Sequence, residues 1–258
     1  MSKPIPIITR VKDTSRLSEN MQSVILESER LKQFPAVQPG AYIKLIFEAS
    51  GVPFTSSSHQ DTPRMMRTYT IRKLDKNKGQ LQIDMVLHAH NGVSGPAATW
   101  AAKAKLGDEI AIAGPGSVKQ VDTKADWVLL AGDTTALPAI ESHLESIPKD
   151  TKGYAFISVG SENDIRALVK PKDIDVIWVD QNSGGLASRI SGASFPDSTP
   201  SIWAAAEFSQ MREMRALFAE RFSVSRNELY LSSYWKFGRS DEQHKVDKRN
   251  DAMQLQQM

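Results

Sequence analysis

The hydrophobic pattern of the chain changes near Asp122, and this change limits the folds that the chain can adopt. Before Asp122, short β-like runs such as Ala41 to Phe47 and Leu81 to His88 alternate with clusters of turn-forming residues. After it, continuous apolar runs such as Trp127 to Ala131 alternate with helical segments. The first pattern is typical of an antiparallel barrel and the second of a parallel α/β sheet. We therefore expect an α+β chain of two domains, which a length of 258 residues also favours.

Three segments follow from this change. We assign 1–120 to a β-barrel domain, 121–238 to an α/β domain and 239–258 to a polar tail, for which a helix from Val246 onward and disorder both stay open. Further strands are expected at Val24 to Glu27, Thr68 to Lys73, Glu109 to Ala113, Ala155 to Val159, Asp175 to Val179, Ile202 to Ala206 and Tyr230 to Ser233. Helices are expected at Pro96 to Ala104, Ala136 to Glu145 and Ser209 to Arg221.

The composition excludes several kinds of chemistry. The chain has no cysteine, so thiol nucleophiles, zinc-thiolate sites and cysteine-ligated iron–sulfur clusters are excluded, and redox chemistry would need a bound cofactor. A formal charge of +2 is too small for a typical nucleic-acid-binding protein. No apolar stretch approaches the ~18 residues needed to span a bilayer, and the N-terminal segment reaches a charge too early for a secretory signal. We expect a soluble, cytoplasmic monomer with neither nucleic-acid nor membrane partners.

The run from Arg67 to Arg72 carries a cation, a planar ring and hydroxyl groups along one expected strand. Because successive side chains of a strand point to opposite faces, Arg67 and Tyr69 lie on one face and Thr70 on the other. Tyr69 would stack on a planar heterocycle, while Arg67 neutralises a phosphate and Thr70 hydrogen-bonds a ring heteroatom. A solvated amphipathic strand without a ligand is the alternative.

A glycine-bearing loop joins the expected strand that ends at His88 to the expected helix at Pro96. Backbone N–H groups at a helix start carry about half a positive charge, and Gly95 permits the close approach that a pyrophosphate needs. A plain strand-to-helix turn explains the same residues. His88 and His90 are two residues apart, but no third ligand accompanies them, so we expect no metal site.

Small and hydroxyl residues, Gly132 to Ala136, follow the first expected parallel strand. In open α/β sheets, ligands bind at this carboxyl edge. The small side chains would let two flat cofactor rings approach each other. An N-capping turn at Asp133 or Thr135 explains the polar residues equally well.

Taken in order, these motifs resemble those of the siderophore-interacting proteins, which are relatives of the ferredoxin–NADP reductases. The resemblance extends over nearly the whole chain. It is carried by Arg67-x-Tyr69-Thr70-x-Arg72, Asp84-x-x-x-His88, Gly95-Pro96-Ala97-x-x-Trp100-Ala101, Gly132-Asp133-x-Thr135-Ala136-Leu137-Pro138-Ala139-Ile140, Trp203 to Glu207 and Tyr234 to Gly238. It implies a ferredoxin-reductase-like, flavin-binding barrel followed by an NAD(P)-binding sheet.

The resemblance also implies a bound FAD and the residues that hold it. Arg67, Tyr69 and Thr70 would contact the flavin ring and phosphate. The other residues expected around FAD and the incoming nicotinamide are Asp84, Leu87, His88, Gly95, Pro96, Ala97, Thr99, Thr134, Thr135, Ala136 and Trp235. For Trp235, a cover over the flavin and a buried packing role both stay open.

The implied activity is that of a ferric-siderophore reductase, in which reduced flavin passes single electrons to chelated Fe(III) and Fe(II) is released. The reaction needs no nucleophile or general base, so we expect no catalytic side chain. A basic cleft would collect the anionic chelate, and similarity to the family assigns Lys44, Lys119 and Lys236 to it, although a solvated surface position explains each of them as well.

The electron donor stays open between NADH, NADPH and a ferredoxin. The family commonly has glycine where this chain has Ala206, whose methyl group would crowd a nucleotide approaching the backbone. Two alternative functions also stay open: a flavin-free siderophore-binding carrier, and a general flavin reductase that reduces iron incidentally.

Overall fold

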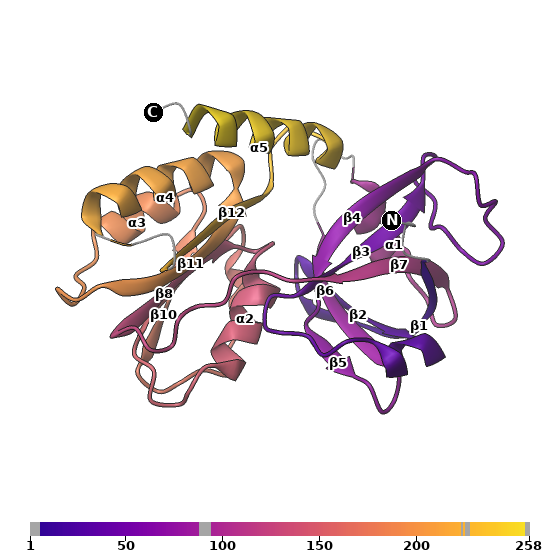
Figure 1. The fold of residues 1–258 in the computed structure, drawn as a ribbon, viewed down its shortest axis with the longest axis horizontal. Coiled ribbons are helices and arrows are strands. Elements are labelled where there is room, and N and C mark those ends of the chain that lie inside the picture. Colours follow the sequence, from indigo (N-terminus) through magenta and orange to yellow (C-terminus); the bar gives the residue numbers. More distant parts are fainter. Residues whose placement is uncertain (1–5, 88–93, 223, 225–227, 256–258) are drawn as a thin grey trace. The chain divides into compact units, whose positions relative to one another are not determined.

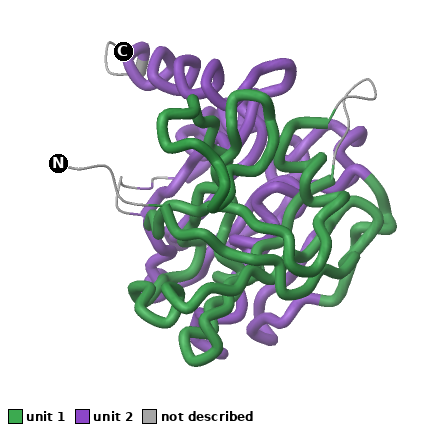
Figure 2. Tube along the Cα trace, turned by 90° about the vertical axis from the view of Figure 1, so that its right-hand side faces the viewer, with its two compact units in different colours: residues 1–118, 141–143, 161–167 green, residues 119–140, 144–160, 168–258 purple. Residues whose placement is uncertain are grey.

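The computed structural model describes residues 6–87, 94–222, 224 and 228–255, and the chain divides into two compact units (Figure 2). Unit 1 comprises residues 1–118 together with the short segments 141–143 and 161–167. Unit 2 comprises residues 119–140, 144–160 and 168–258.

Unit 1 is built on a curled antiparallel sheet of seven strands in the order β4-β3-β7-β1-β2-β6-β5 (Figure 1). The strands are β1 Ile7–Ser18, β2 Met21–Glu27, β3 Tyr42–Glu48, β4 Arg64–Thr70, β5 Lys73–Asp75, β6 Gln80–Val86 and β7 Glu109–Gly116. The sheet curls until β4 contacts β6, and the N–H of Arg72 donates to the carbonyl of Gln82 at 2.8 Å. The expected antiparallel barrel is thereby confirmed.

The core of unit 1 lies inside this curled sheet. Alternate residues of β3, among them Ile43 and Leu45, are buried in one apolar cluster, because successive side chains of a strand point to opposite faces. The helix α1 Pro96–Lys103 closes the cluster with Ala97 and Trp100, which are three residues apart and therefore share one helical face. A 3₁₀ turn, Glu29–Gln33, adds Leu31.

The strand expected from Thr68 to Lys73 is two strands in the structure. β4 ends at Thr70, and β5 begins at Lys73 on the other edge of the sheet. Between them, the N–H of Ile71 bonds Ala41 next to β3, whereas the N–H of Arg72 bonds Gln82 on β6. The chain therefore crosses from one edge of the sheet to the other within two residues, and local alternation cannot reveal such a change of partner.

Unit 2 contains a parallel sheet of five strands in the order β10-β9-β8-β11-β12, which confirms the expected α/β sheet. Its strands are β8 Trp127–Asp133, β9 Gly153–Val159, β10 Ile174–Asp180, β11 Pro200–Glu207 and β12 Leu229–Trp235. The helices are α2 Leu137–Ser146, of which residues 141–143 belong to unit 1, α3 Gly185–Ser191, α4 Phe208–Arg221 and α5 Asp241–Leu255. A 3₁₀ turn, Glu162–Asp164, lies in the 161–167 segment of unit 1. In the described part of the chain, no helix has the length and apolar character needed to cross a bilayer.

The strand order reverses at β8, which lies between β9 and β11. Right-handed crossovers in opposite directions place α2 on one face of the sheet and α3 and α4 on the other, as Figure 1 shows. Trp127, Phe156 and Phe218 fill the core on the side of α3 and α4. The carboxyl ends of β8 and β11 are therefore neighbours at the point where an open α/β sheet binds its ligand.

One buried histidine makes the stability of the fold sensitive to acid. His143 on α2 is 1% exposed, and burial lowers the pKa of its imidazole from 6.5 to about 4. As the pH falls through this window, the unfolded chain binds a proton that the folded chain does not, so stability falls by about 2 kcal/mol between pH 6.5 and pH 5. We expect His143→Gln to lose less stability than the parent between pH 7 and pH 5 in urea unfolding; equal losses would contradict this.

Candidate functional site

The strand β4 carries the first group of expected site residues within unit 1. β4 pairs with β3 so that Arg67 stands opposite Leu45 and Tyr69 opposite Ile43. Tyr69 packs on the core with part of its ring exposed, and Thr70 is buried. The guanidinium of Arg67 is half-buried and donates to the carbonyl of Met66 at 3.0 Å. One short strand thus presents a cation, a ring and a hydroxyl group.

β6 supplies the next two expected residues. The carboxylate of Asp84 is buried, accepts a hydrogen bond from the Gln82 amide at 3.0 Å and lies 3.8 Å from Arg72 Nε. Leu87 follows the end of β6 and packs on the core. Since both β4 and α1 contact β6, these residues belong to one region of unit 1. His88, which was also expected there, lies outside the described residues.

The amino terminus of α1 has the features of an anion site. Gly95 is the N-cap. Among the described residues no side chain caps the helix, and a methyl group added at Gly95 would meet no described atom within 4 Å. Pro96 is the first helical residue, and Ala97 is buried against the core. The N–H of Thr99 donates to the Gly95 carbonyl at 2.9 Å, which closes the first turn. Helix-start N–H groups without a capping side chain suit a phosphate.

These three elements fit a dinucleotide flavin. β4 offers a hydroxyl group and a ring to a heterocycle, Arg67 offers a positive charge to a phosphate, and the open start of α1 offers backbone N–H groups to a pyrophosphate. These hydrogen-bond donors and the positive charge therefore match FAD, the cofactor that the resemblance implies. The individual residue assignments in this site stay predictions.

In unit 2, the carboxylate of Asp133 joins the carboxyl ends of three strands. Asp133 is the last residue of β8 and is 6% exposed. One oxygen accepts hydrogen bonds from the N–H and the hydroxyl of Thr135, at 2.9 and 2.5 Å. The other accepts from the N–H of Glu207 on β11 and from the indole N–H of Trp235 on β12, both at 2.8 Å. Burial raises the pKa of Asp133, and these hydrogen bonds oppose that shift.

The remaining expected residues at this edge differ in exposure. Thr134 and Thr135 are partly exposed, whereas Ala136 is fully buried. A methyl group added at Gly132 would lie 2.6 Å from both the Ala136 methyl and the Ala205 carbonyl oxygen, so this glycine serves close packing.

Ala206, where the family commonly has glycine, is also fully buried. Its methyl group belongs to the apolar cluster that contains Met214 and Phe218 of α4. The extra methyl group of Ala206 therefore packs in the core. It does not create the steric obstruction to a nucleotide that the sequence suggested.

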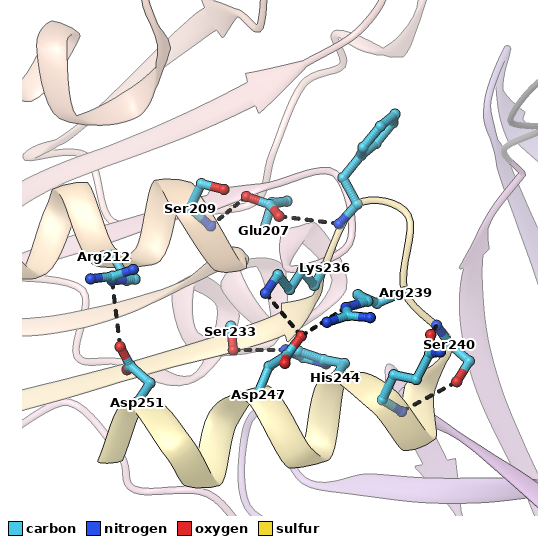
Figure 3. A network of polar contacts seen from close by, with 12 residues as sticks. Glu207, Ser209, Arg212, Ser233, Lys236, Arg239, Ser240, His244, Asp247 and Asp251 are labelled. Carbon is cyan, nitrogen blue, oxygen red and sulfur yellow. Dashed lines mark hydrogen bonds and ion pairs between the residues drawn. The ribbon is translucent and has the colours of Figure 1, made fainter. Parts of the chain in front are cut away.

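The C-terminal helix α5 is attached to unit 2 by polar contacts with β12 and with the chain that follows it (Figure 3). His244 Nε2 lies 2.8 Å from the hydroxyl oxygen of Ser233 on β12. Asp247 lies 2.8 Å from Lys236 Nζ and 3.2 Å from Arg239 Nε. The hydrogen bond from Lys236 is the largest of the interactions that lower the pKa of Asp247. Lys236, expected to bind substrate, is thus paired with a carboxylate.

The carboxylate of Asp251 anchors the second half of α5. It accepts from Arg215 Nη2 at 2.7 Å and lies 3.4 Å from Arg212 Nε, and its side chain is 9% exposed. We expect Asp251→Asn to weaken the docking of α5 by about 1–2 kcal/mol, because it removes the charge of a largely buried carboxylate that pairs with two partly exposed arginines. Amide hydrogen exchange along α5 measures this loss. The matched control is Asp241→Asn, which breaks a more exposed pair with Lys245 and should cost under about 1 kcal/mol; equal effects would contradict the prediction.

The two expected substrate lysines of unit 2 lie at opposite ends of β12. Lys119 Nζ is 3.5 Å from the carbonyl of Leu229, the first residue of the strand, whereas Lys236 follows its last residue. At about 3.3 Å per residue these ends are about 20 Å apart. Lys44 stands opposite Thr68 in unit 1. The assignment of these lysines to substrate binding stays a prediction.

Two acidic residues with large structural consequences were missing from the expected site. The sequence places Asp133 in a family motif and in an N-capping turn, and Asp247 in the polar tail, without predicting a site role for either carboxylate. A signal for Asp133 exists in the sequence, because an acidic residue stands two positions after the continuous apolar run that ends at Ala131. No comparable signal marks Asp247, whose partners lie on another element.

The fold and the two candidate regions define a class of protein. The structure is similar to that of ferredoxin-NADP+ reductase from Plasmodium falciparum, with a TM-score of 0.63 at 14% identity over 85% of this chain and 95% of that chain, a likeness of fold alone. Residues 10–119 match the siderophore-interacting FAD-binding domain, and residues 125–238 match the siderophore-interacting protein domain. The class is that of the siderophore-related flavin reductases.

The chain belongs to the siderophore-interacting protein family. It is 31% identical to the ferric vibriobactin reductase ViuB of Vibrio cholerae over 243 residues, which cover 88% of each chain. Its structure is similar to that of the siderophore-interacting protein SipS from Aeromonas hydrophila, with a TM-score of 0.84 at 28% identity over 96% of this chain and 98% of that chain.

Proposed function

We propose that this protein is an FAD-dependent ferric-siderophore reductase. The observation that carries the proposal is the match to the siderophore-interacting FAD-binding domain over the same residues that form the β4 face and the uncapped start of α1. The similarity to a protein named as a ferric vibriobactin reductase supports the iron-chelate substrate. When bound, FAD would supply the conversion between a two-electron hydride donor and one-electron reduction of Fe(III).

In this proposal the residues of unit 1 hold and orient the cofactor. Arg67 neutralises a phosphate, and Tyr69 and Thr70 contact the ring. Gly95 leaves room for the pyrophosphate at the start of α1, where the backbone N–H groups bind it. No side chain of the chain acts as nucleophile or base.

The electron donor in this proposal is a nicotinamide nucleotide, NADH or NADPH, bound in unit 2 at the carboxyl ends of β8 and β11. Open α/β sheets bind nucleotides at the point where the strand order reverses, and that point lies between these two strands. The buried methyl group of Ala206 leaves this edge free of the expected obstruction. A reduced ferredoxin is the competing donor that the experiment must test.

The substrate in this proposal is an anionic ferric siderophore attracted by lysine side chains, with Lys44, Lys119 and Lys236 as the assigned contacts. Long-range attraction of this kind raises the association rate and weakens with salt. Because Lys236 is paired with Asp247, an anionic chelate would compete with that carboxylate for it. Fe(II) binds hard anionic oxygen donors less tightly than Fe(III), so reduction releases the metal without cleavage of the chelator.

The test uses the purified full chain under anaerobic conditions. We expect it to retain a yellow flavin, to lose its visible flavin absorption with NADH or NADPH, and to regain it on addition of ferric siderophore while a ferrous-specific chelator detects Fe(II). Bleaching only by reduced ferredoxin would reject the nicotinamide donor. A protein that stays colourless after reconstitution with FAD would reject the proposed function.

A further inference from the structure

The helix α5 lies against the rest of unit 2 with a polar face, which is unusual for a surface helix. Of the α5 side chains that the structure describes, 241–254, those of His244 and Asp251 are buried. The apolar ones, Val246, Ala252 and Met253, are all exposed. A surface helix ordinarily buries its apolar stripe against the core. The contacts that hold α5 are therefore mainly ionic and hydrogen-bonded, and another anion can compete for such contacts.

The middle of α5 places one carboxylate between two cations (Figure 3). Asp247 lies 2.8 Å from Lys236 Nζ and 3.2 Å from Arg239 Nε, and its side chain is 15% exposed against 28% and 45% for theirs. The two cations thus enclose the carboxylate. The ammonium group of Lys236 also lies 4.5 Å from the centre of the Phe208 ring, a favourable cation–π contact. Phe208 therefore helps to keep this cation in place when Asp247 leaves.

A second carboxylate repeats this arrangement one turn further along α5. Asp251 lies 2.7 Å from Arg215 Nη2 and 3.4 Å from Arg212 Nε, both on α4, and its side chain is again less exposed than those of its partners. Because Asp247 and Asp251 stand at positions i and i+4, they share one face of the helix, about 6 Å apart along its axis. The cations that this face contacts form one basic surface, which consists of Arg212, Arg215, Lys236 and Arg239.

The basic surface carries more positive charge than α5 neutralises. Its four cations meet two carboxylates, and no other carboxylate of the described residues lies within ion-pair distance of them. Partial exposure and screening by salt also keep each of the existing pairs weak. A ligand with several negative charges would therefore neutralise this surface more fully than α5 does.

We propose that α5 is an autoinhibitory element: its two carboxylates occupy the basic surface until an anionic ferric chelate displaces them and loosens the helix. This inference rests on the proposed function for the identity of the anion, and it adds Arg212, Arg215 and Arg239 to the residues that attract it. The same competition disfavours a neutral chelate, because a ligand without charge gains little from the cations and cannot replace a carboxylate. The protein should therefore take polyanionic chelates, such as tris-catecholates, in preference to neutral tris-hydroxamates.

The first test follows α5 in the full-length protein with a chelate that cannot be reduced. Gallium(III) tris-catecholate has the charge and shape of the ferric complex, and gallium(III) tris-hydroxamate is its neutral counterpart. At saturation with the anionic complex we expect the amides of residues 241–254 to exchange with solvent about tenfold faster, because displacement of both carboxylates frees the helix to unfold locally. The neutral complex should leave their exchange unchanged. Slower or unchanged exchange with the anionic complex, or no binding of it, would overturn the inference.

The second test measures the dissociation constant of the anionic complex by calorimetry in two variants of α5. Asp247→Asn removes one competing carboxylate, so it should tighten binding by about three- to tenfold. Asp241→Asn removes the same charge from the same helix, but Asp241 pairs with Lys245 of α5 and not with the basic surface. Its dissociation constant should stay within about twofold of the parent's. Equal tightening in both variants would assign the effect to net charge and overturn the inference.

Neither test involves electron transfer, so the inference and the proposed function can fail separately. A protein that reduces ferric chelates while α5 does not respond to the anionic complex would overturn the inference and leave the proposed function standing. A protein that binds no flavin but releases α5 with the anionic complex would reject the proposed function and leave the release of α5 by anions standing. If Asp247→Asn does not fold, the exchange measurement on the parent protein still decides.

Discussion

Replacing Arg67 by glutamine is expected to weaken FAD binding by about 10- to 100-fold, because it removes the charge-assisted hydrogen bond to a phosphate that the proposed function assigns to this residue. Arg67 is half-buried on β4, where it is held beside Met66, and the shortened neutral amide cannot supply the same positive charge. The dissociation constant is measured by titrating flavin-free protein with FAD and following the quenching of flavin fluorescence. The loss should be smaller at high salt, since part of the parent's affinity is electrostatic.

The matched control is Arg64→Gln on the same strand. Arg64 lies over the Phe54 ring at 4.2 Å and donates to the carbonyl of Gln60 at 2.8 Å, so its contacts are made within its own loop. We expect FAD affinity to change by less than about threefold in this variant. Equal weakening in both variants would mean that net charge on the strand, and not a contact from Arg67, controls binding.

A single methyl group at Gly132 should destabilise unit 2 by about 2–4 kcal/mol. Alanine at this position places its Cβ 2.6 Å from the Ala205 carbonyl oxygen and 2.6 Å from the Ala136 methyl, and one of these contacts is with backbone. Relief requires β8 to move away from β11, which would strain the hydrogen bond between Asp133 and Glu207. The free energy of unfolding in urea measures the effect.

Gly192→Ala is the control for this prediction. Gly192 ends α3 with a right-handed helical backbone, and an added Cβ has no neighbour closer than 3.8 Å. Its unfolding free energy should stay within about 0.5 kcal/mol of the parent. If both alanine variants lost the same stability, the cause would be a general property of glycine replacement, and the close packing at Gly132 would not be responsible.

Much of the sheet structure was predictable from local pattern. The continuous apolar run from Trp127 marks a strand covered on both faces, and β8 is buried along its whole length. The polar/apolar alternation at the start of the Gln80–Val86 strand likewise marks a strand that faces a core. The motif around Arg67 and Tyr69 places a cation and a ring on one strand without any knowledge of the fold.

The strand β1 was not predicted, and the reason is geometric. It spans Ile7–Ser18, but its pairing with β2 shifts register between Val11 and Asp13 and again between Arg16 and Ser18. Each shift breaks the period of two on which strand prediction depends. Its second half is mostly exposed, so apolar residues do not mark it either.

The sequence by itself determined most of the segments that form strands and helices, that the chain has two kinds of sheet, and that Arg67, Tyr69 and Thr70 share a strand, because these depend on near neighbours along the chain. Only the tertiary structure decided which residues contact one another at the carboxyl ends of the parallel strands. Asp133 binds Glu207 and Trp235 across 74 and 102 residues, and Lys236 pairs with a carboxylate of α5. Such contacts follow from the order of strands in the sheet and from one irregular register, neither of which leaves a local pattern.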